Sequence, residues 1–294
     1  MKAANFDYAR AATIDEACRL LASAKGDGKI IAGGQTLVPL LVMRLARPAL
    51  LIDINRVAEL QGIEVEEGAV TVKACTRQAV ALGSAEIRAK APLLAKALGF
   101  VGHVQTRNRG TVGGSLANAD PSAEIGLASL VLEAEIVAWR KGSRRTIPIA
   151  EFFRGPMTTA LEEDECLTAI RFPVWRGAGR IGTGFQELSP RRSDFALAAA
   201  AAQLALDDKG VCRRLSVGVG GIAGSPFRAE RVAQRLVGTR LEAGDLAAAL
   251  ADLTDGIEIM SDIHGSADYR RRVAAALVAR AIDEAKRYAS AGKG

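Results

Sequence analysis

The organisation of the chain is decided by residues 31–40, which read IAGGQTLVPL. The paired Gly33 and Gly34 follow a short apolar run and precede a segment with helical spacing. Glycine lets backbone N–H groups approach a ligand closely, and the start of a helix adds partial positive charge. The stretch therefore predicts a strand-to-helix turn that can hold an anionic group such as phosphate. A turn that needs glycine only for its backbone conformation is the alternative on this segment alone.

The segments on either side of this turn predict one strand, turn, helix and strand unit. Apolar runs occupy residues 29–32 and 50–54, and residues 37–45 have helical spacing between them. A helix is expected earlier, at residues 14–24, where a capping-box sequence precedes apolar residues at helical spacing. Alternating strands and helices with short connections are typical of α/β structure. We therefore expect a first α/β domain at residues 1–57.

Two further domains are expected after this unit. The apolar pattern changes to period two from Gly62 onward, which indicates a hairpin and a second domain at residues 58–175. Residues 176–179 resemble a linker, and residues 178–294 are expected to form an antiparallel sheet with a helical cover. The elements predicted in these domains are a hairpin at 63–72, helices at 87–98 and 124–132, strands at 136–139, 167–172, 181–188, 195–206 and 211–219, and helices at 226–237, 245–253 and 267–289.

A second glycine turn, residues 111–115, offers similar chemistry in the second domain. Polar side chains surround it, from Thr111 and Ser115 through Asn118 to Glu124. Two such turns favour one ligand held between two domains, because a dinucleotide has both a pyrophosphate and sugar hydroxyls to bind.

Other segments predict structure rather than chemistry. Residues 218–224 read GVGGIAG and imitate a dinucleotide-binding fingerprint, but the spacing differs and no acidic-ended strand follows, so a structural role is expected. The acidic run 162–165 is interpreted as an exposed turn before a strand. The four cysteines lie more than forty residues apart, and neither His103 nor His264 has metal-ligand neighbours at suitable spacing, so no metal site is expected.

The composition excludes several classes of protein. Lys and Arg number 39 and Asp and Glu 33, which gives a net charge of +6 spread along the chain, and aromatic residues make up only 4%. Binding of nucleic acid favours a basic patch with stacking aromatic residues, so no nucleic-acid partner is expected. The longest apolar stretch, residues 195–206, is far shorter than the roughly 20 residues that cross a bilayer. With no apolar signal stretch at the N-terminus, a cytoplasmic protein without membrane contact is expected.

The two turns and their flanks resemble the FAD motifs of one family. Residues 31–40 and residues 107–121, which read RNRGTVGGSLANADP, are similar to the FAD motifs in the medium subunit of molybdenum hydroxylases. This group includes xanthine dehydrogenase, carbon monoxide dehydrogenase and N-heterocycle dehydrogenases. The resemblance covers essentially the whole chain, including residues 170–173 and 191–196.

The resemblance implies a fold, cofactors and partners. The expected fold class is α+β, with two N-terminal α/β subdomains in a PCMH-type, vanillyl-alcohol-oxidase-like FAD-binding fold and a C-terminal antiparallel sheet with a helical layer. The implied protein is an FAD-binding electron-transfer subunit of a heterotrimeric oxidoreductase. Its partners would be a small subunit with two [2Fe-2S] clusters and a large subunit with molybdopterin, assembled as a dimer of heterotrimers.

The resemblance also implies FAD contacts at and near the two turns. Residues 32–36 and 111–115 would cradle the pyrophosphate. Asn118 and Asp120 would extend the second cradle, and Glu124 would accept a hydrogen bond from a sugar hydroxyl.

Further residues would surround the adenine and the flavin ring. Val101, His103 and Leu167 resemble residues of these surroundings, and Asp194 and Phe195 resemble a pair beside the isoalloxazine. No catalytic and no metal-binding residue is expected. The complete set of expected cofactor-binding residues is Ile31, Ala32, Gly33, Gly34, Gln35, Thr36, Leu37, Val101, His103, Thr111, Gly113, Gly114, Ser115, Asn118, Asp120, Glu124, Leu167, Asp194 and Phe195.

Two alternatives stand beside this interpretation. A free-standing flavin-dependent oxidoreductase would carry its own catalytic acid or base over the flavin, and the sequence shows no such constellation. A non-catalytic assembly module without flavin would not need hydroxyl and amide side chains around both turns. The electron-transfer subunit is therefore the favoured interpretation.

Overall fold

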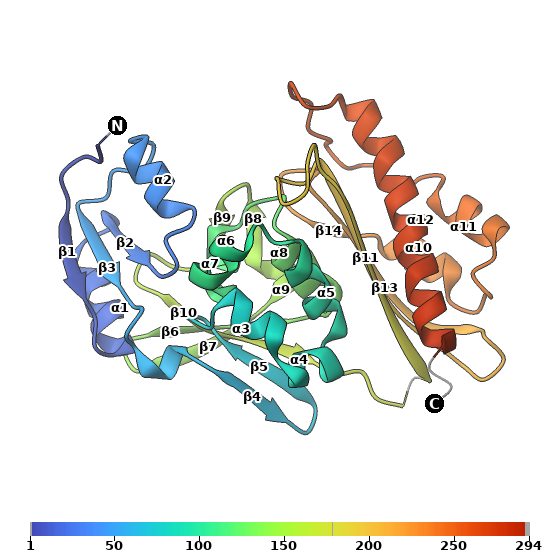
Figure 1. The fold of residues 1–294 in the computed structure, drawn as a ribbon, viewed down its shortest axis with the longest axis horizontal. Helices are drawn as coiled ribbons and strands as arrows, with labels where there is room; N and C mark the ends of the chain where they lie inside the picture. Colours follow the sequence, from blue (N-terminus) through green and yellow to red (C-terminus); the bar gives the residue numbers. More distant parts are fainter. Residues whose placement is uncertain (1, 178, 292–294) are drawn as a thin grey trace.

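Three larger β-sheets follow one another along the chain, and β8 and β9 form a small two-stranded sheet, in the computed structural model, which describes residues 2–177 and 179–291 (Figure 1). The first sheet is parallel, with strand order β1 (Asp7–Arg10), β3 (Leu50–Asp53), β2 (Gly28–Ile31). Helix α1 (Ile14–Ser23) confirms the predicted helix, and Thr13 caps it by accepting from the Glu16 N–H at 3.1 Å.

The second sheet is antiparallel, and a group of short helices lies beside it. Its strand order is β4 (Ile63–Glu66), β5 (Ala69–Lys73), β10 (Cys166–Pro173), β6 (Glu135–Arg140), β7 (Ser143–Pro148). The accompanying elements are α3 (Gln78–Gly83), α4 (Ala85–Lys90), α5 (Pro92–Phe100), α6 (Val104–Arg109), α7 (Val112–Asn118), α8 (Glu124–Val131), α9 (Ile149–Phe152), β8 (Phe153–Gly155) and β9 (Thr158–Thr159).

The single helix predicted at residues 87–98 is wrong. The structure has two helices there, α4 and α5, which meet at Ala91. Pro92 disfavours the helical conformation of the residue before it, and the φ of Ala91 is −133°. The sequence signal for this break was therefore local.

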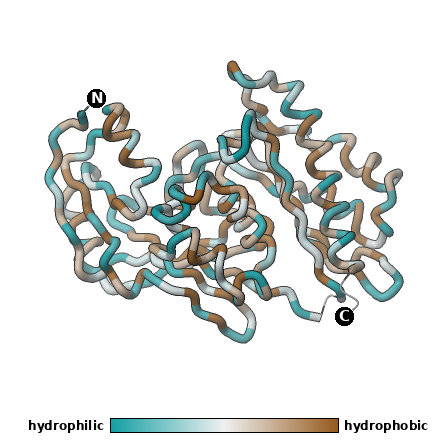
Figure 2. The backbone as a smooth tube through the Cα atoms, in the orientation of Figure 1, coloured by the Kyte–Doolittle hydropathy of each residue, from teal (hydrophilic) through white to brown (hydrophobic). Residues whose placement is uncertain are grey.

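The third sheet is antiparallel and buried on both faces. Its order is β11 (Arg180–Leu188), β12 (Ala198–Leu206), β13 (Cys212–Gly220), β14 (Phe227–Arg228). Even-numbered alanines of β12 join a core with α12 (Ala267–Ala291), whereas Ala199 and Ala201 join the core of the second sheet and its helices. Hydrophobic and hydrophilic residues alternate along α12 (Figure 2). Helices α10 (Glu230–Leu236) and α11 (Ala243–Leu250) complete the cover; α10 starts later than predicted because Phe227 and Arg228 form an edge strand.

The second and third sheets are joined by specific contacts. Lys96 on α5 donates to the Thr183 carbonyl at 2.8 Å and forms an ion pair with Glu284 on α12. The rings of Phe100 and Phe185 pack with centroids 5.1 Å apart. These contacts position β11 against the helices of the second sheet. They thereby also position the segment that follows β11. Within the described residues, no helix is long and apolar enough to cross a lipid bilayer.

Candidate cofactor site

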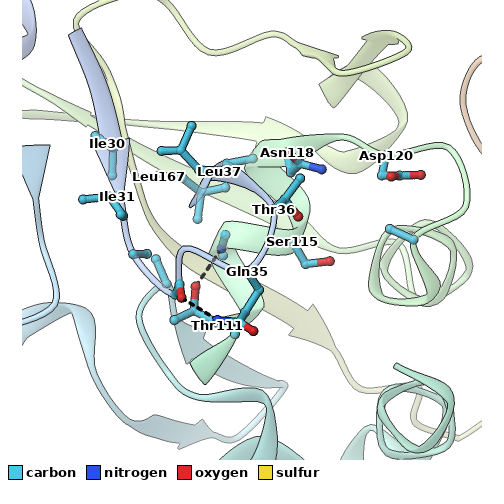
Figure 3. Close-up of a pocket in the computed structure, with 18 of the residues that line it drawn as sticks. Ile30, Ile31, Gln35, Thr36, Leu37, Thr111, Ser115, Asn118, Asp120 and Leu167 are labelled. Carbon is cyan, nitrogen blue, oxygen red and sulfur yellow. Dashed lines mark hydrogen bonds between the residues drawn. The ribbon is translucent and has the colours of Figure 1, made fainter. Parts of the chain in front are cut away.

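A cavity of about 760 Å³ lies where the two glycine turns meet (Figure 3). Its walls come from the first turn, from α7 and the start of α8, from Leu167 on β10, and from the segment 193–195 between β11 and β12. The volume lies within the range of about 300–1,000 Å³ that is usual for cofactor sites. All three sheets therefore contribute to one site.

All but two of the expected site residues line this cavity. Gly34 instead lines a smaller cavity of about 380 Å³ beside the first turn. His103 is exposed and lines neither cavity, because Gly102, with a φ of +42°, turns the chain just before it. The residues brought to the larger cavity are Ile31, Ala32, Gly33, Gln35, Thr36, Leu37, Val101, Thr111, Gly113, Gly114, Ser115, Asn118, Asp120, Glu124, Leu167, Asp194 and Phe195.

The first turn has backbone donors to offer. Among the hydrogen bonds of the described residues, the N–H groups of Gly33, Gly34 and Gln35 have no acceptor. Gly33 is also required for space, since a Cβ there would lie 2.5 Å from the Arg109 carbonyl oxygen. Gly33 and Gln35 line the larger cavity, so the turn brings two of these unpaired N–H groups to its side, which suits a phosphate.

The second turn works differently from the first, which corrects the expectation of two equivalent cradles. Gly113 N–H donates to the Ala74 carbonyl at 2.9 Å, and Gly114 N–H donates to Thr111 Oγ1 at 3.1 Å. A Cβ at Gly113 would lie 2.6 Å from the Ala74 Cβ, so this glycine is needed for packing. What this turn offers the cavity is side-chain chemistry, through Ser115 and its neighbours on α7 (Figure 3).

Two carboxyl groups stand at the junction of α8 and β11. Glu124 is the first residue of α8 and lines the cavity. Burial, with a contribution from Asp120, raises the pKa of Glu124 to about 7. Glu187 lies on the face of β11 that Phe185 packs against the second sheet, and its Oε2 is buried with no hydrogen-bond partner in the described structure. Burial and the neighbouring Glu124 raise the pKa of Glu187 to about 8.

These raised pKa values predict a specific pH dependence of folding. Each carboxyl keeps its proton in the folded chain at a pH where the unfolded chain has lost it. The contribution of these two carboxyl groups to the free energy of unfolding should therefore become less favourable as the pH rises from about 5 to about 8. We expect Glu187→Gln to flatten this fall and to stabilise the FAD-free chain at pH 8 by about 2–4 kcal/mol.

Urea denaturation at a series of pH values measures this effect. Glu59→Gln, at an exposed position far from the junction, is the control and should keep the profile of the unmodified chain. A Glu187→Gln profile with the original slope would contradict the prediction.

The segment after β11 forms part of the cavity wall. Ser193 has a φ of +67°, and Arg191 Nε donates to Asp194 Oδ2 at 2.9 Å. Hydrogen bonding from the Phe195 N–H, aided by Arg191, holds the pKa of Asp194 below its usual value. Phe195 is 71% exposed as a residue and lines the cavity, so it places an apolar side chain at the cavity mouth.

The sequence did not identify every residue of the wall. Gln78, Thr106 and Leu161 also line the cavity. The interpretation of the run 162–165 as an exposed turn is wrong for Glu165, which is buried and accepts two hydrogen bonds of 2.6 Å from Arg145. Arg145 lies on β7 and Glu165 in the loop before β10, so only the fold brings the two residues together.

The cysteines of the described chain are buried thiols. Burial raises the pKa of Cys18 to about 11 and that of Cys75 to about 12, and Cys166 and Cys212 are buried in the same way. No group of three or more His, Cys, Asp or Glu is arranged to hold a metal ion within the described residues.

Comparison with known proteins places this chain in a family. The profile described as the FAD binding domain in molybdopterin dehydrogenase matches residues 4–175, and that of the CO dehydrogenase flavoprotein C-terminal domain matches residues 183–285. The 6-hydroxypseudooxynicotine dehydrogenase complex subunit alpha of Paenarthrobacter nicotinovorans is 37% identical over 97% of this chain and 96% of its own length. The carbon monoxide dehydrogenase medium chain of Hydrogenophaga pseudoflava is 34% identical over 95% of this chain and 96% of its own length.

Solved structures agree with the sequence comparison. Carbon monoxide dehydrogenase from Hydrogenophaga pseudoflava superposes with a TM-score of 0.94 at 33% identity, covering 98% of this chain and 99% of the matched chain. Quinoline 2-oxidoreductase from Pseudomonas putida 86 gives a TM-score of 0.92 at 34% identity, with coverage of 98% and 99%. The expected fold class is confirmed. The chain belongs to the FAD-binding medium subunits of the molybdenum hydroxylase family.

Proposed function

We propose that this chain is the electron-transfer subunit of a heterotrimeric molybdenum hydroxylase. It would receive electrons from two [2Fe-2S] clusters on a small partner and deliver them to an external acceptor. A large partner with molybdopterin would oxidise the substrate, and two heterotrimers would pair. The observation that carries this proposal is the cavity between the glycine turns, in a chain that matches a carbon monoxide dehydrogenase chain over nearly its whole length.

The residues of the cavity fit FAD in a definite way. The unpaired N–H groups of the first turn would hold the pyrophosphate, and Ser115 and Asn118 would bind hydroxyl or phosphate oxygens. Glu124, whose pKa is raised to about 7, can in its protonated form donate as well as accept a hydrogen bond at a sugar hydroxyl. When bound, FAD supplies the ability to accept electrons singly and to release them as a pair.

The burial of the four thiols supports a placement of the iron–sulfur clusters on a different subunit. Iron–sulfur clusters are held by thiolates, usually four, and here burial disfavours the thiolate form. The clusters would therefore lie on another chain, and the role of this chain would be confined to FAD.

Depletion of FAD from the complete complex tests the proposal. In the intact complex, anaerobic addition of substrate should bleach both the flavin and the iron–sulfur absorbance. After removal of FAD, substrate should still bleach the iron–sulfur bands, but turnover with the external acceptor should be lost and should return when FAD is added. The control is the lone chain loaded with FAD, which should be yellow and inert toward substrate.

Two outcomes would contradict it. A lone, FAD-loaded chain that turns over substrate would be a free-standing flavoenzyme. A chain that binds no FAD, alone or in the complex, would be an assembly module.

A further inference from the structure

Side chains from two sheets connect the two glycine turns by hydrogen bonds. Asn55 follows β3, and its Nδ2 donates to the Ala32 carbonyl at 2.7 Å. Arg77, the residue before α3, donates from Nη2 to Asn55 Oδ1 at 2.8 Å and from Nη1 to the Arg109 carbonyl. Ala32 belongs to the first turn, and Arg109 stands just before the second. Two side chains therefore form a bridge between the turns, which we call the Asn55–Arg77 bridge.

Asp53 determines how the Asn55 amide points. Its Oδ1 accepts from Asn55 N at 2.8 Å and from Asn55 Nδ2 at 2.7 Å. Burial alone would raise the pKa of Asp53, but hydrogen bonds from Tyr8 and Asn55, with the charge of Arg10, hold that pKa below its usual value. An ionised carboxylate only accepts hydrogen bonds, so the amide nitrogen of Asn55 must face Asp53. The amide oxygen is then left to accept from Arg77.

Backbone contact between the two turns prevents the Asn55–Arg77 bridge from drawing them closer together. A Cβ on Gly33 would lie 2.5 Å from the Arg109 carbonyl oxygen and 2.7 Å from Gly110 Cα, so the two turns already touch. Contact sets the smallest separation of the turns, and the bridge resists a larger one. The separation is therefore defined from both sides.

The bridge lies outside the larger cavity. Asn55 and Arg109 line the smaller cavity, and Arg77 lines neither. None of the three is placed to touch a cofactor in the larger cavity, so any effect of the bridge on FAD must act through the turns.

We propose that Arg77 and Asn55 are positioning residues for FAD, which hold the two turns at the separation that the cofactor needs without touching it. The proposal rests on FAD as the occupant of the larger cavity. A ligand that contacts two separate turns binds more tightly when their separation is set beforehand, because less ordering is left to occur on binding.

Arg77→Met tests the proposal on the full chain. Methionine keeps much of the aliphatic stem but removes both donors. Since hydrogen bonds from a charged donor are the stronger kind, we expect the Kd for FAD to rise by about 10- to 100-fold, mainly through faster dissociation. Arg77→Lys keeps the charge and can reach one acceptor, so its Kd for FAD should lie between those of the unmodified chain and of Arg77→Met. Asn55→Leu should raise the Kd similarly, and the double variant should add little further.

The measurements are the recovery of FAD fluorescence on release and the ³¹P NMR spectrum of the bound pyrophosphate. Arg88→Met is the matched control, because Arg88 on α4 also donates to a main-chain carbonyl, that of Leu82 at 3.2 Å. It should leave the Kd and the spectrum unchanged. The melting temperature of the FAD-free chain should be similar in Arg77→Met and Arg88→Met.

Several results would overturn the proposal. One is an Arg77→Met chain with an unaltered dissociation rate and spectrum. Another is a fall in the melting temperature of the FAD-free variant as large as that of the loaded variant. If Arg77→Met does not fold, Arg77→Lys tests the proposal in its place. An Arg77→Lys chain with an unaltered Kd for FAD would then contradict the positioning role of the bridge. An unmodified chain that binds no FAD would instead contradict the cofactor assignment itself.

Discussion

Replacing Gly33 by alanine is expected to abolish retention of FAD. The new Cβ would lie 2.5 Å from the Arg109 carbonyl oxygen and 2.7 Å from Gly110 Cα. Both atoms belong to the main chain and cannot rotate away, so the two turns must move apart. Because the proposed FAD contacts come from N–H groups of the first turn and side chains of the second, we expect the Kd for FAD to rise by at least about 100-fold.

The ratio of flavin to protein after purification, followed by titration with FAD, measures the loss. Gly99→Ala is the control, since Gly99 lies on an exposed face of α5 where a Cβ would meet nothing within 4 Å. That variant should retain FAD fully. A Gly33→Ala chain that is as yellow as the unmodified chain would show that the cofactor does not depend on the contact between the turns.

The part of the site that could be predicted from the sequence is the part encoded locally. Paired glycines between a strand and a helix mark a turn wherever they occur, and both turns border the cavity as expected. Glycine identity did not reveal how each turn uses its N–H groups. Gly113 donates to Ala74, some forty residues earlier in the chain, and only the folded structure shows that this donor is already used.

The parts that the sequence missed depend on long-range partners or on weak patterns. Three of the four residues of strand β1 are exposed, so the sequence shows no apolar run there. The strand is defined instead by its parallel pairing with β3. Burial of Glu165, which stands just before β10, requires Arg145 on β7, two strands away in the sheet. The break before Pro92 is the opposite case. Its signal, the proline itself, is local, but the helical spacing on both sides led to the prediction of one continuous helix.

Replacing Gly184 by valine is expected to unfold the third sheet and its helical cover. Strand β11 and helix α12 lie at backbone contact. A Cβ on Gly184 would overlap the Ala281 carbonyl oxygen and lie 2.8 Å from the Ala281 carbonyl carbon, and a Cβ on Gly182 would lie 2.6 Å from Ala289 N. Helix α12 supplies much of the core on that face, so its displacement should cost more than about 4 kcal/mol.

Urea denaturation and limited proteolysis measure this loss, and Gly244→Ala provides the control. Gly244 is an exposed position of α11 with open space around its Cα, where alanine should be neutral or stabilise by up to about 1 kcal/mol. Since the segment 193–195 joins β11 to β12 and lines the cavity, Gly184→Val should also weaken FAD binding, but only together with the loss of stability. Gly33→Ala should lose FAD while the third sheet keeps its resistance to urea. A Gly184→Val chain that unfolds like the unmodified chain would mean that α12 can leave β11 at little cost, and the two glycines would then have no packing role.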